Sequence, residues 1–350
     1  MKEPDSIRKT RRGRVPPEGG PVTMATIGKL AGVSQVTVSR ALSNPEKVSA
    51  ATMERIQEAI RITGFVPNAL AGALASRKSC LITALVPSIT NVVYSSLLHG
   101  FSEIMRAEGY QLMVSETGFL PETEEALIFT HLSRRPDGIL LTGIHHSAAA
   151  RKMLLGAGIP VVEFWDITES PVDCCVGFSH TETGWRTAEM AHGWGYRRAA
   201  TVSAGDERAL RRRDGFANRF AELAGGAEIP GITGEAGPAS LQSGRAALAR
   251  LIDDHGFRGG VIQCSSDQSA HGILTEARVR GLRVPEDIAV IGFGDQDYAA
   301  FTDPALTTVR VDRDRLGRAA ARAMLTRFRG EEDPERVTDI GFEVIRRGSA

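Results

Sequence analysis

Polar side chains that could bind a polyhydroxylated ligand recur through the C-terminal part of the chain. They are hydroxyls, amides, carboxylates and guanidinium groups, and each directly follows a short apolar run: Ser88, Thr90, Asn91, Asp166, Ser179, His180, Asp206, Glu207, Arg208, Ser265, Ser266, Asp267 and Asp295. Such groups pair with ligand hydroxyls, and an arginine can hold a carboxylate or a phosphate through two parallel hydrogen bonds. Each residue alone could instead cap a helix, so the prediction of a ligand site rests on the whole group.

A second set of side chains near the N-terminus could read DNA. Gln35 and Val36 begin a predicted helix. Glutamine can bond bidentately to adenine, which discriminates between bases by about 1–3 kcal/mol, and an apolar side chain can meet a thymine methyl group. Thr37, Ser39 and Arg40 are expected to contact phosphates.

Three short predicted helices would hold these DNA-reading side chains. Thr23 can cap a first helix that Gly32 ends, Ser34 can cap a second helix over residues 35–43, and Ser49 can cap a third. Two helices joined by a glycine-containing turn form the helix-turn-helix layout, although many such hairpins bind no DNA. The apolar residues expected to form the shared core are Ile27, Leu30, Ala31, Val38, Ala41, Leu42, Met53, Ile56 and Ile60.

The charge distribution favours a polyanionic partner at the N-terminal end. The chain has 42 Lys+Arg and 42 Asp+Glu, but residues 1–78 carry 13 basic and 6 acidic side chains. Residues 1–21 lack an apolar period and are predicted to be a disordered basic tail. A basic tail is often merely solvated, so charge indicates where DNA would bind and not whether it binds.

The rest of the chain alternates short apolar runs with helical patterns. This alternation predicts parallel sheets covered by helices, and about 270 residues suit two lobes better than one sheet. The predicted strands are Leu81–Val86, Tyr110–Val114, Gly138–Thr142, Val161–Phe164, Val176–Phe178, Ala199–Val202, Gly260–Cys264 and Ile288–Phe293.

The sequence lacks the motifs of several enzyme classes and of common metal sites. G-x-S-x-G, P-loop and H-E-x-x-H patterns do not occur, so we expect no enzyme and no cofactor. The four cysteines form no C-x-x-C pair, and the adjacent His145 and His146 are expected not to bind metal. Without a predicted membrane span or signal peptide, the protein is expected to be cytoplasmic and nucleoid-associated.

The N-terminal segment resembles the headpiece of the lactose-repressor (LacI/GalR) family. The resemblance runs from Val22 to Arg40 and continues at Val48-Ser49 and Phe65-Val66-Pro67-Asn68. It implies a DNA-binding headpiece over residues 22–66 and a hinge helix and linker over residues 67–79. The alternative interpretation of this last segment is a plain alanine-rich linker. In the family this hinge helix inserts a leucine into the minor groove. The implied DNA contacts are Thr23, Ser34, Gln35, Val36, Thr37, Ser39, Arg40, Asn68, Ala71 and Leu74.

The same resemblance extends through the body, to about residue 345. It rests on Pro136-Asp137-Gly138-Ile139, Ser266-Asp267-Gln268, the segment 281–288 and Leu306-Thr307-Thr308-Val309. The implied fold is an N-terminal all-α helix-turn-helix headpiece plus an α/β periplasmic-binding-protein-like core of two doubly wound lobes, residues 80–350. Lobe 1 would comprise about 80–177 and 310–340, and lobe 2 about 178–309 and 341–350.

Within the family, the chain looks like the gluconate-operon repressor subgroup. The likeness rests on Val86-Pro87-Ser88-Ile89-Thr90-Asn91, Val161-Val162-Glu163 with Asp166, Val176-Gly177-Phe178 and Asp206-Glu207-Arg208. It implies a sugar acid such as gluconate as the effector, with Arg208 or Arg212 facing the carboxylate. The implied effector residues are Ser88, Asn91, Tyr94, Asp166, Arg208, Arg212, Ser266, Asp267 and Asp295.

Some positions depart from these patterns. Arg212 matches the family's effector-binding arginine, but Ser266 and Gly294 stand where many members carry Asn and Asp. The reading helix departs from the subgroup at Gln35 and Val36, which leaves the operator open. Residues Arg211 to Arg213 could equally be a solvated charge run.

Together these features predict a homodimeric, DNA-binding transcriptional regulator. The dimer is expected because two-fold symmetric operators need two headpieces. By analogy with the subgroup, we expect a repressor of sugar-acid genes that a small effector releases from its operator. A corepressor-dependent or activating regulator that responds to another sugar or phosphosugar would use the same parts. The alternative from another class is a soluble sugar-binding or sugar-processing protein with an incidental helical N-terminus.

Overall fold

The computed structural model describes residues 21–67, 78–234, 237, 239–331 and 335–350. It divides between Ser79 and Cys80 into two compact units, and each is described by itself. Among the described residues, no helix is both long and apolar enough to cross a membrane.

The N-terminal unit is a bundle of short helices whose ends are set by local capping. The Thr23 and Ser34 hydroxyls accept hydrogen bonds from the backbone N–H groups of Thr26 and Thr37, and Gly32 ends the first helix at φ 68°. These caps are the ones that the sequence predicts. The elements are α1 (Met24–Ala31), α2 (Gln35–Ser43), the 3-10 helix η1 (Pro45–Lys47) and α3 (Ala50–Thr63).

The core of the N-terminal unit is narrower than predicted. Ile27, Val38 and Ile56 are fully buried, but Leu30 and Leu42 are 39% and 38% exposed, so the prediction that both face inward is wrong. For Leu30 the physical reason lies in the packing of α1, since a Cβ on Gly28 would lie 2.7 Å from the Val33 carbonyl oxygen. This contact turns Gly28 inward, and a residue two positions along a helix then points nearly the opposite way.

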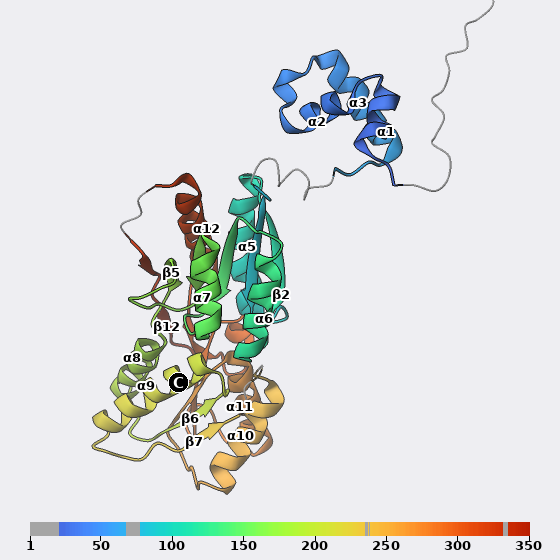
Figure 1. Cartoon of the computed structure of the whole chain (residues 1–350). Coiled ribbons are helices and arrows are strands. Elements are labelled where there is room, and N and C mark those ends of the chain that lie inside the picture. The colour runs from blue at the N-terminus through green and yellow to red at the C-terminus, as the bar shows by residue number, and fades with distance from the viewer. Residues whose placement is uncertain (1–20, 68–77, 235–236, 238, 332–334) are drawn as a thin grey trace, which may run out of the picture. The chain divides into compact units, whose positions relative to one another are not determined.

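The second unit contains two sheets, and the first defines lobe 1. Its strands are all parallel, in the order β11-β5-β4-β3-β1-β2. Helices α5 and α12 pack on each other and cover one face, and α6 and α7 cover the other (Figure 1). The strands are β1 (Leu81–Val86), β2 (Gln111–Glu116), β3 (Gly138–Thr142), β4 (Val161–Phe164), β5 (Cys174–Gly177) and β11 (Val337–Asp339); the helices are α5 (Val92–Ala107), α6 (Pro121–Leu132), α7 (Ala148–Ala157) and α12 (Arg313–Arg329).

The second sheet defines lobe 2. It has the order β12-β10-β9-β8-β6-β7 and is parallel except for the pair β10 and β12. Helices α8 and α9 cover one face, and α10 and α11 cover the other. The strands are β6 (Ala199–Ser203), β7 (Gly231–Thr233), β8 (Val261–Cys264), β9 (Ala289–Phe293), β10 (Thr307–Arg310) and β12 (Glu343–Ile345); the helices are α8 (His180–Gly193), α9 (Glu207–Leu223), α10 (Leu241–Asp253), α11 (Asp267–Val279) and the 3-10 helix η2 (Ala299–Phe301).

These two helix-covered sheets confirm the predicted α/β architecture. The chain passes between lobes after β5, between β10 and α12, and between β11 and β12. Loops that follow strands of both lobes meet between them, which is where ligands bind in open α/β sheets.

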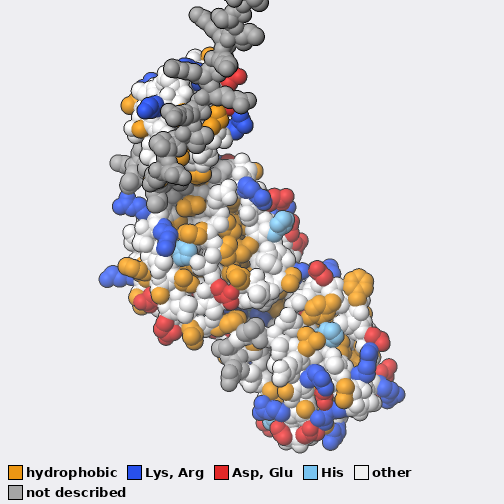
Figure 2. Space-filling model, turned by 90° about the vertical axis from the view of Figure 1, so that its right-hand side faces the viewer, with side chains coloured by type: hydrophobic (Ala, Val, Ile, Leu, Met, Phe, Trp, Pro, Cys, Tyr) orange, Lys and Arg blue, Asp and Glu red, His pale blue; other side chains and the backbone are white. Residues whose placement is uncertain are grey.

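The two lobes differ at their surfaces. Figure 2 shows hydrophobic side chains gathered on one face of lobe 1, whereas charged side chains dominate the far end of lobe 2. Exposed apolar residues of lobe 1 include Leu120, Phe129 and Leu155, each more than half exposed.

Candidate effector pocket and nucleic-acid interface

The first two turns of α2 present an exposed surface suited to DNA. Gln35, Ser39 and Arg40 are exposed, and Val36 is 66% exposed although it is apolar. Thr37 is half-buried, and its hydroxyl lies 2.9 Å from the Ser34 hydroxyl. The structure therefore brings the predicted reading residues to one helix end, with Ser34 and Thr37 engaged in its cap.

Other predicted DNA contacts lie elsewhere. Thr23 caps α1, where its hydroxyl is 3.1 Å from that of Thr26. The hinge residues Asn68, Ala71 and Leu74 lie outside the described residues.

A tight pocket of about 70 Å³ lies between the two lobes. Five predicted effector residues line it: Asn91, Tyr94, Arg208, Arg212 and Ser266. Sequence reasoning gave no effector role to Phe119, Trp165, Gln268, Phe293 and Gln296, which also line the pocket. Trp165 could have been found, because it directly follows β4.

Arg212 is the most deeply buried cation of the pocket, only 5% exposed. Its guanidinium donates to His180 Nδ1 at 2.8 Å and to the Ser265 carbonyl oxygen at 3.1 Å, and it stacks 3.8 Å above the centre of the Phe293 ring. Burial lowers the pKa of Arg212 to about 10, so the side chain stays charged at neutral pH. Within the described part of the chain its Nε–H is buried and has no hydrogen-bond partner.

Arg208 brings a second guanidinium to the pocket, one helical turn before Arg212 on α9. It crosses to lobe 1, where a Cβ on Gly143 would lie 2.7 Å from its Nη1. Its acidic neighbour Asp206 is 4.0 Å away and caps α9 by accepting from the Ala209 N–H. Among the described residues that line this pocket, the charged ones are two arginines and one carboxylate, so this lining favours an anion.

The four other predicted effector residues do not line this pocket, and protein groups engage their side chains. Ser88 bonds with Thr90 at 3.0 Å. Asp166 is paired with Arg211, and Asp267 accepts from the Thr308 hydroxyl and the Gln296 N–H. Asp295 pairs with Arg310 and Arg347.

The three consecutive arginines of α9 serve three different contacts. Arg211 bonds to Asp166, Arg212 lines the pocket, and Arg213 pairs with Asp214 and donates to the Thr233 hydroxyl. All three therefore have protein partners, and the side chains of Arg211 and Arg213 are only 27% and 26% exposed, so a solvated charge run describes none of them.

A cluster of aromatic side chains packs around Trp165, which lines the pocket. Trp165 meets Phe178 edge-on at 5.1 Å between ring centres and Tyr94 at 6.1 Å, and Phe293 completes the cluster. Trp165 has φ 71°, a left-handed conformation that few side chains adopt and that costs free energy wherever it occurs. Aromatic rings packed around this residue hold it there.

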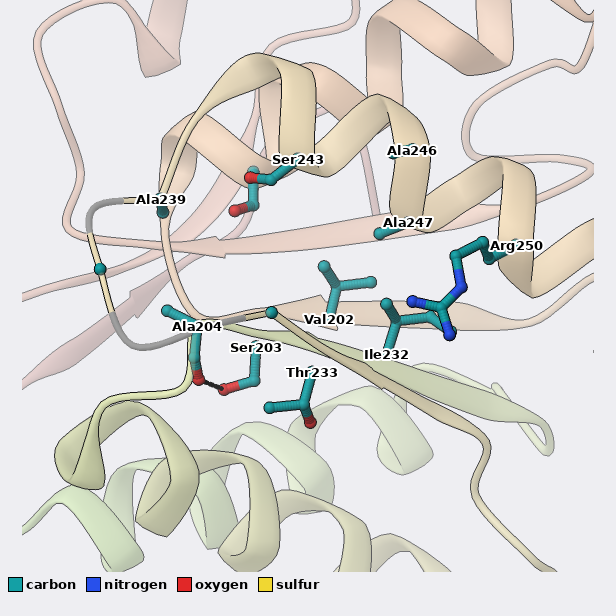
Figure 3. A pocket seen from close by; sticks show the side chains of 13 residues that line it. Val202, Ser203, Ala204, Ile232, Thr233, Ala239, Ser243, Ala246, Ala247 and Arg250 are labelled. Atoms are coloured by element: carbon teal, nitrogen blue, oxygen red, sulfur yellow. Dashed lines mark hydrogen bonds between the residues drawn. The ribbon is translucent and has the colours of Figure 1, made fainter.

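A larger pocket of about 500 Å³ opens beside the first, inside lobe 2 (Figure 3). It lies between the ends of β6 and β7 and helix α10, and both pockets share Ala204, Gly237 and Ala239. Its polar side chains are Ser203, Thr233, Ser243, Arg250 and Ser269.

Comparison with known proteins finds a family match in the N-terminal part of the chain and another in the C-terminal part. Residues 23–68 match the family described as bacterial regulatory proteins, lacI family, and residues 188–350 match the periplasmic binding protein-like domain. The chain is 35% identical over 332 residues to the HTH-type transcriptional regulator GntR of Pseudomonas aeruginosa, covering 94% of this chain and 96% of that protein.

Solved structures of transcriptional regulators have a similar fold. A LacI-family transcriptional regulator from Silicibacter pomeroyi superposes with a TM-score of 0.87 at 32% identity, covering 94% of this chain and 99% of the other. The transcription regulator GntR of Chromobacterium violaceum superposes with a TM-score of 0.72 at 32% identity, covering 77% of this chain and 98% of the other. The predicted fold, with its helix-turn-helix headpiece and two-lobed core, is confirmed.

Proposed function

The chain belongs to the LacI family of bacterial regulatory proteins, and from this membership we propose that its effector is a small sugar acid of the gluconate type. It is a DNA-binding transcriptional regulator. Members of the family bind operator DNA and small effectors and act as dimers. The finer proposal is a homodimeric repressor of sugar-acid genes that the effector releases from DNA.

The observation that carries the effector proposal is the charge of the interlobe pocket. Arg208 and Arg212 line it, and Asp206 is the one carboxylate among the described lining residues; the Arg212 Nε–H is a buried donor without a partner in the described chain. A carboxylate would satisfy that donor. The amides of Asn91, Gln268 and Gln296 and the hydroxyl of Ser266 suit the hydroxyls of a sugar acid.

At the DNA, we propose that Gln35 and Val36 contact bases and that Ser39 and Arg40 contact phosphates. The exposure of all four supports this assignment. Asn68, Ala71 and Leu74 would form the hinge contacts that the family resemblance implies. Effector binding would oppose DNA binding through a coupling free energy of about 1–3 kcal/mol.

Calorimetric titration of the full-length protein with gluconate, sorbitol and glucose tests the effector proposal. We expect gluconate to bind at least about tenfold more tightly than the two neutral ligands, because a hydrogen bond to a charged group contributes about 1.5–3 kcal/mol. Equal or tighter binding of sorbitol or glucose would overturn the sugar-acid proposal.

A further inference from the structure

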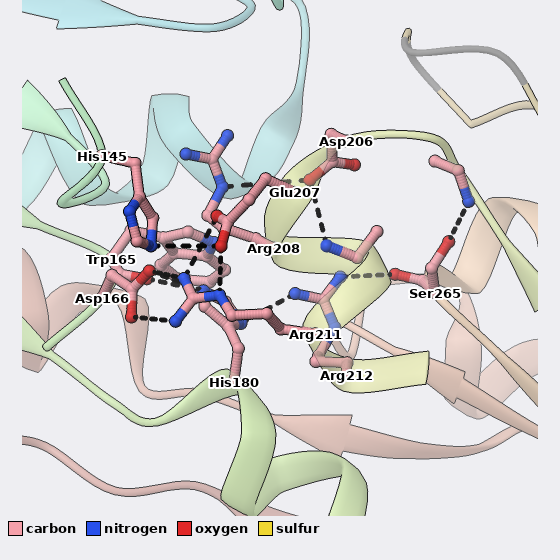
Figure 4. A network of polar contacts seen from close by, with 12 residues as sticks. His145, Trp165, Asp166, His180, Asp206, Glu207, Arg208, Arg211, Arg212 and Ser265 are labelled. Carbon is pink, nitrogen blue, oxygen red and sulfur yellow. Dashed lines mark hydrogen bonds and ion pairs between the residues drawn. The ribbon is translucent and has the colours of Figure 1, made fainter. Parts of the chain in front are cut away.

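Helix α9 carries two pairs of residues that point in different directions. Arg208 and Arg212, four residues apart, line the effector pocket. Glu207 and Arg211, one position earlier in each turn, pair with lobe 1 side chains that do not line this pocket (Figure 4). Because residues four apart share a helix face, each pair acts as a unit.

The stronger of the two contacts with lobe 1 joins Arg211 to Asp166. The guanidinium of Arg211 donates to both carboxylate oxygens of Asp166, which is fully buried just after β4. Asp166 also accepts from the Ile167 N–H at 2.9 Å. Arg211 is the cation that compensates this buried carboxylate, and a buried charge that loses its partner is strongly destabilised.

The second contact with lobe 1 joins Glu207, which also pairs with Arg211, to His145. Glu207 pairs with Arg211 on α9 and lies 3.1 Å from Nε2 of His145, in the loop between β3 and α7. His145 and Glu207 are each about half exposed, so this pair is worth much less than the buried one.

We propose that Arg211 is a positioning residue for the effector site: with Asp166 it forms an interlobe latch, defined as the pairs Asp166–Arg211 and His145–Glu207, that holds the lobes closed over the pocket. Closure brings the two pocket arginines of α9 against Asn91, Tyr94 and Trp165. The latch deepens the proposed function, since it explains how the affinity of that site depends on lobe closure. Asp166 then acts through Arg211 and does not bind the effector.

Opening of the lobes has a built-in reporter. Trp165 precedes Asp166 and is only 3% exposed, because Tyr94 of lobe 1 and Phe293 of lobe 2 pack around it. Breaking the latch should expose its indole to solvent even when no ligand is present. The chain contains three tryptophans, so replacing Trp185 and Trp194 by phenylalanine leaves Trp165 alone.

The first test measures acrylamide quenching of Trp165 in this single-tryptophan protein without ligand. Arg211→Met should raise the quenching constant at least about twofold, and Arg211→Lys, which keeps one ionic hydrogen bond, should give an intermediate value. Arg213→Met is the matched control on the same helix and should leave quenching unchanged. Equal quenching in the Arg211→Met, Arg213→Met and parent proteins would overturn the latch.

The second test separates the latch from the effector proposal. In the parent protein, Arg211→Met and Asp166→Asn should each weaken gluconate binding about tenfold, and the double variant should lose no more than either single variant. Unchanged gluconate affinity in both variants would contradict the positioning role. Absence of gluconate binding in the parent would sink the effector proposal, while the ligand-free quenching result would still decide the latch.

Discussion

Arg212 donates a hydrogen bond to Nδ1 of His180 at 2.8 Å, and Nε2 of the same imidazole lies 2.9 Å from the Trp165 carbonyl oxygen in the other lobe. A guanidinium only donates and a carbonyl only accepts, so His180 is neutral with its proton on Nε2. Burial, and then the positive charges of Arg212 and Arg208, hold the pKa of His180 well below its ordinary value. The pocket arginine is therefore held by a neutral histidine that spans the lobes.

Replacing His180 should damage effector binding. His180→Phe keeps the ring but removes the acceptor, which leaves a buried Arg212 N–H unsatisfied at a cost of about 1–3 kcal/mol. We expect gluconate affinity to fall about tenfold, as measured by calorimetry, with operator affinity in the absence of effector unchanged. His192→Phe, near the end of the same helix, is the control. Full gluconate affinity in His180→Phe would show that Arg212 needs no such support.

Ligand selectivity should depend on Arg208. Arg208→Met removes one of the two guanidinium groups, so the preference for gluconate over sorbitol should fall by about tenfold or more. Competitive titration of the two ligands measures this ratio. Arg213→Met, outside the pocket, should keep the wild-type preference. A preference that survives Arg208→Met would assign the carboxylate to another group.

Sequence recognition should depend on Gln35 and backbone recognition on Arg40. Gln35→Ala should cost about 1–3 kcal/mol and relax specificity at one base pair of each half-site. Arg40→Ala should weaken binding to all sequences alike and reduce the slope of log affinity against log salt by about 1. Anisotropy titrations over a salt series separate the two effects. A uniform loss for Gln35→Ala would refute a base contact.

Stability should fall at alkaline pH through His146. Burial by itself lowers the pKa of His146, but the hydrogen bond from its ring to Glu124 and the ion pair with Glu163 at 3.3 Å outweigh burial and raise the pKa to about 9. The folded state thus binds the proton more tightly than the unfolded chain. The stabilisation is fully present below about pH 6.5 and is lost as pH rises toward 9, an effect on the order of 3 kcal/mol.

Urea unfolding at pH 6 and pH 9.5, followed by tryptophan emission, measures this loss, since all three tryptophans lie in the second unit. His146→Gln should remove most of the difference between the two pH values. His145→Gln, whose ring is exposed, should retain it. An undiminished difference in His146→Gln would place the titrating group elsewhere.

The headpiece could be predicted from sequence because its signals are local. Two helices begin at the capping residues Thr23 and Ser34, and the first ends at Gly32. These caps involve contacts within a few residues along the chain, so the sequence alone predicts them. The prediction that Leu30 is buried was wrong because its exposure depends on how closely Gly28 packs against Val33 in the following turn. Helical periodicity alone does not report that contact.

The effector pocket was only partly predictable for a related reason. Position after a strand correctly placed Asn91 and Ser266 at the meeting of the lobes. It could not tell which carboxylates would be taken up by protein cations, and Asp166 meets Arg211, 45 residues further along the chain and in the other lobe. The partner of a buried charge is a property of the tertiary fold.

The most direct test of the central claim is fluorescence anisotropy of full-length protein on a pseudo-palindromic fragment from its own upstream region, at fixed salt, with and without gluconate. The account predicts tight, specific binding that gluconate weakens by about 5- to 150-fold, the range of a typical coupling free energy. Specific binding that gluconate leaves unchanged or strengthens would contradict a gluconate-released repressor.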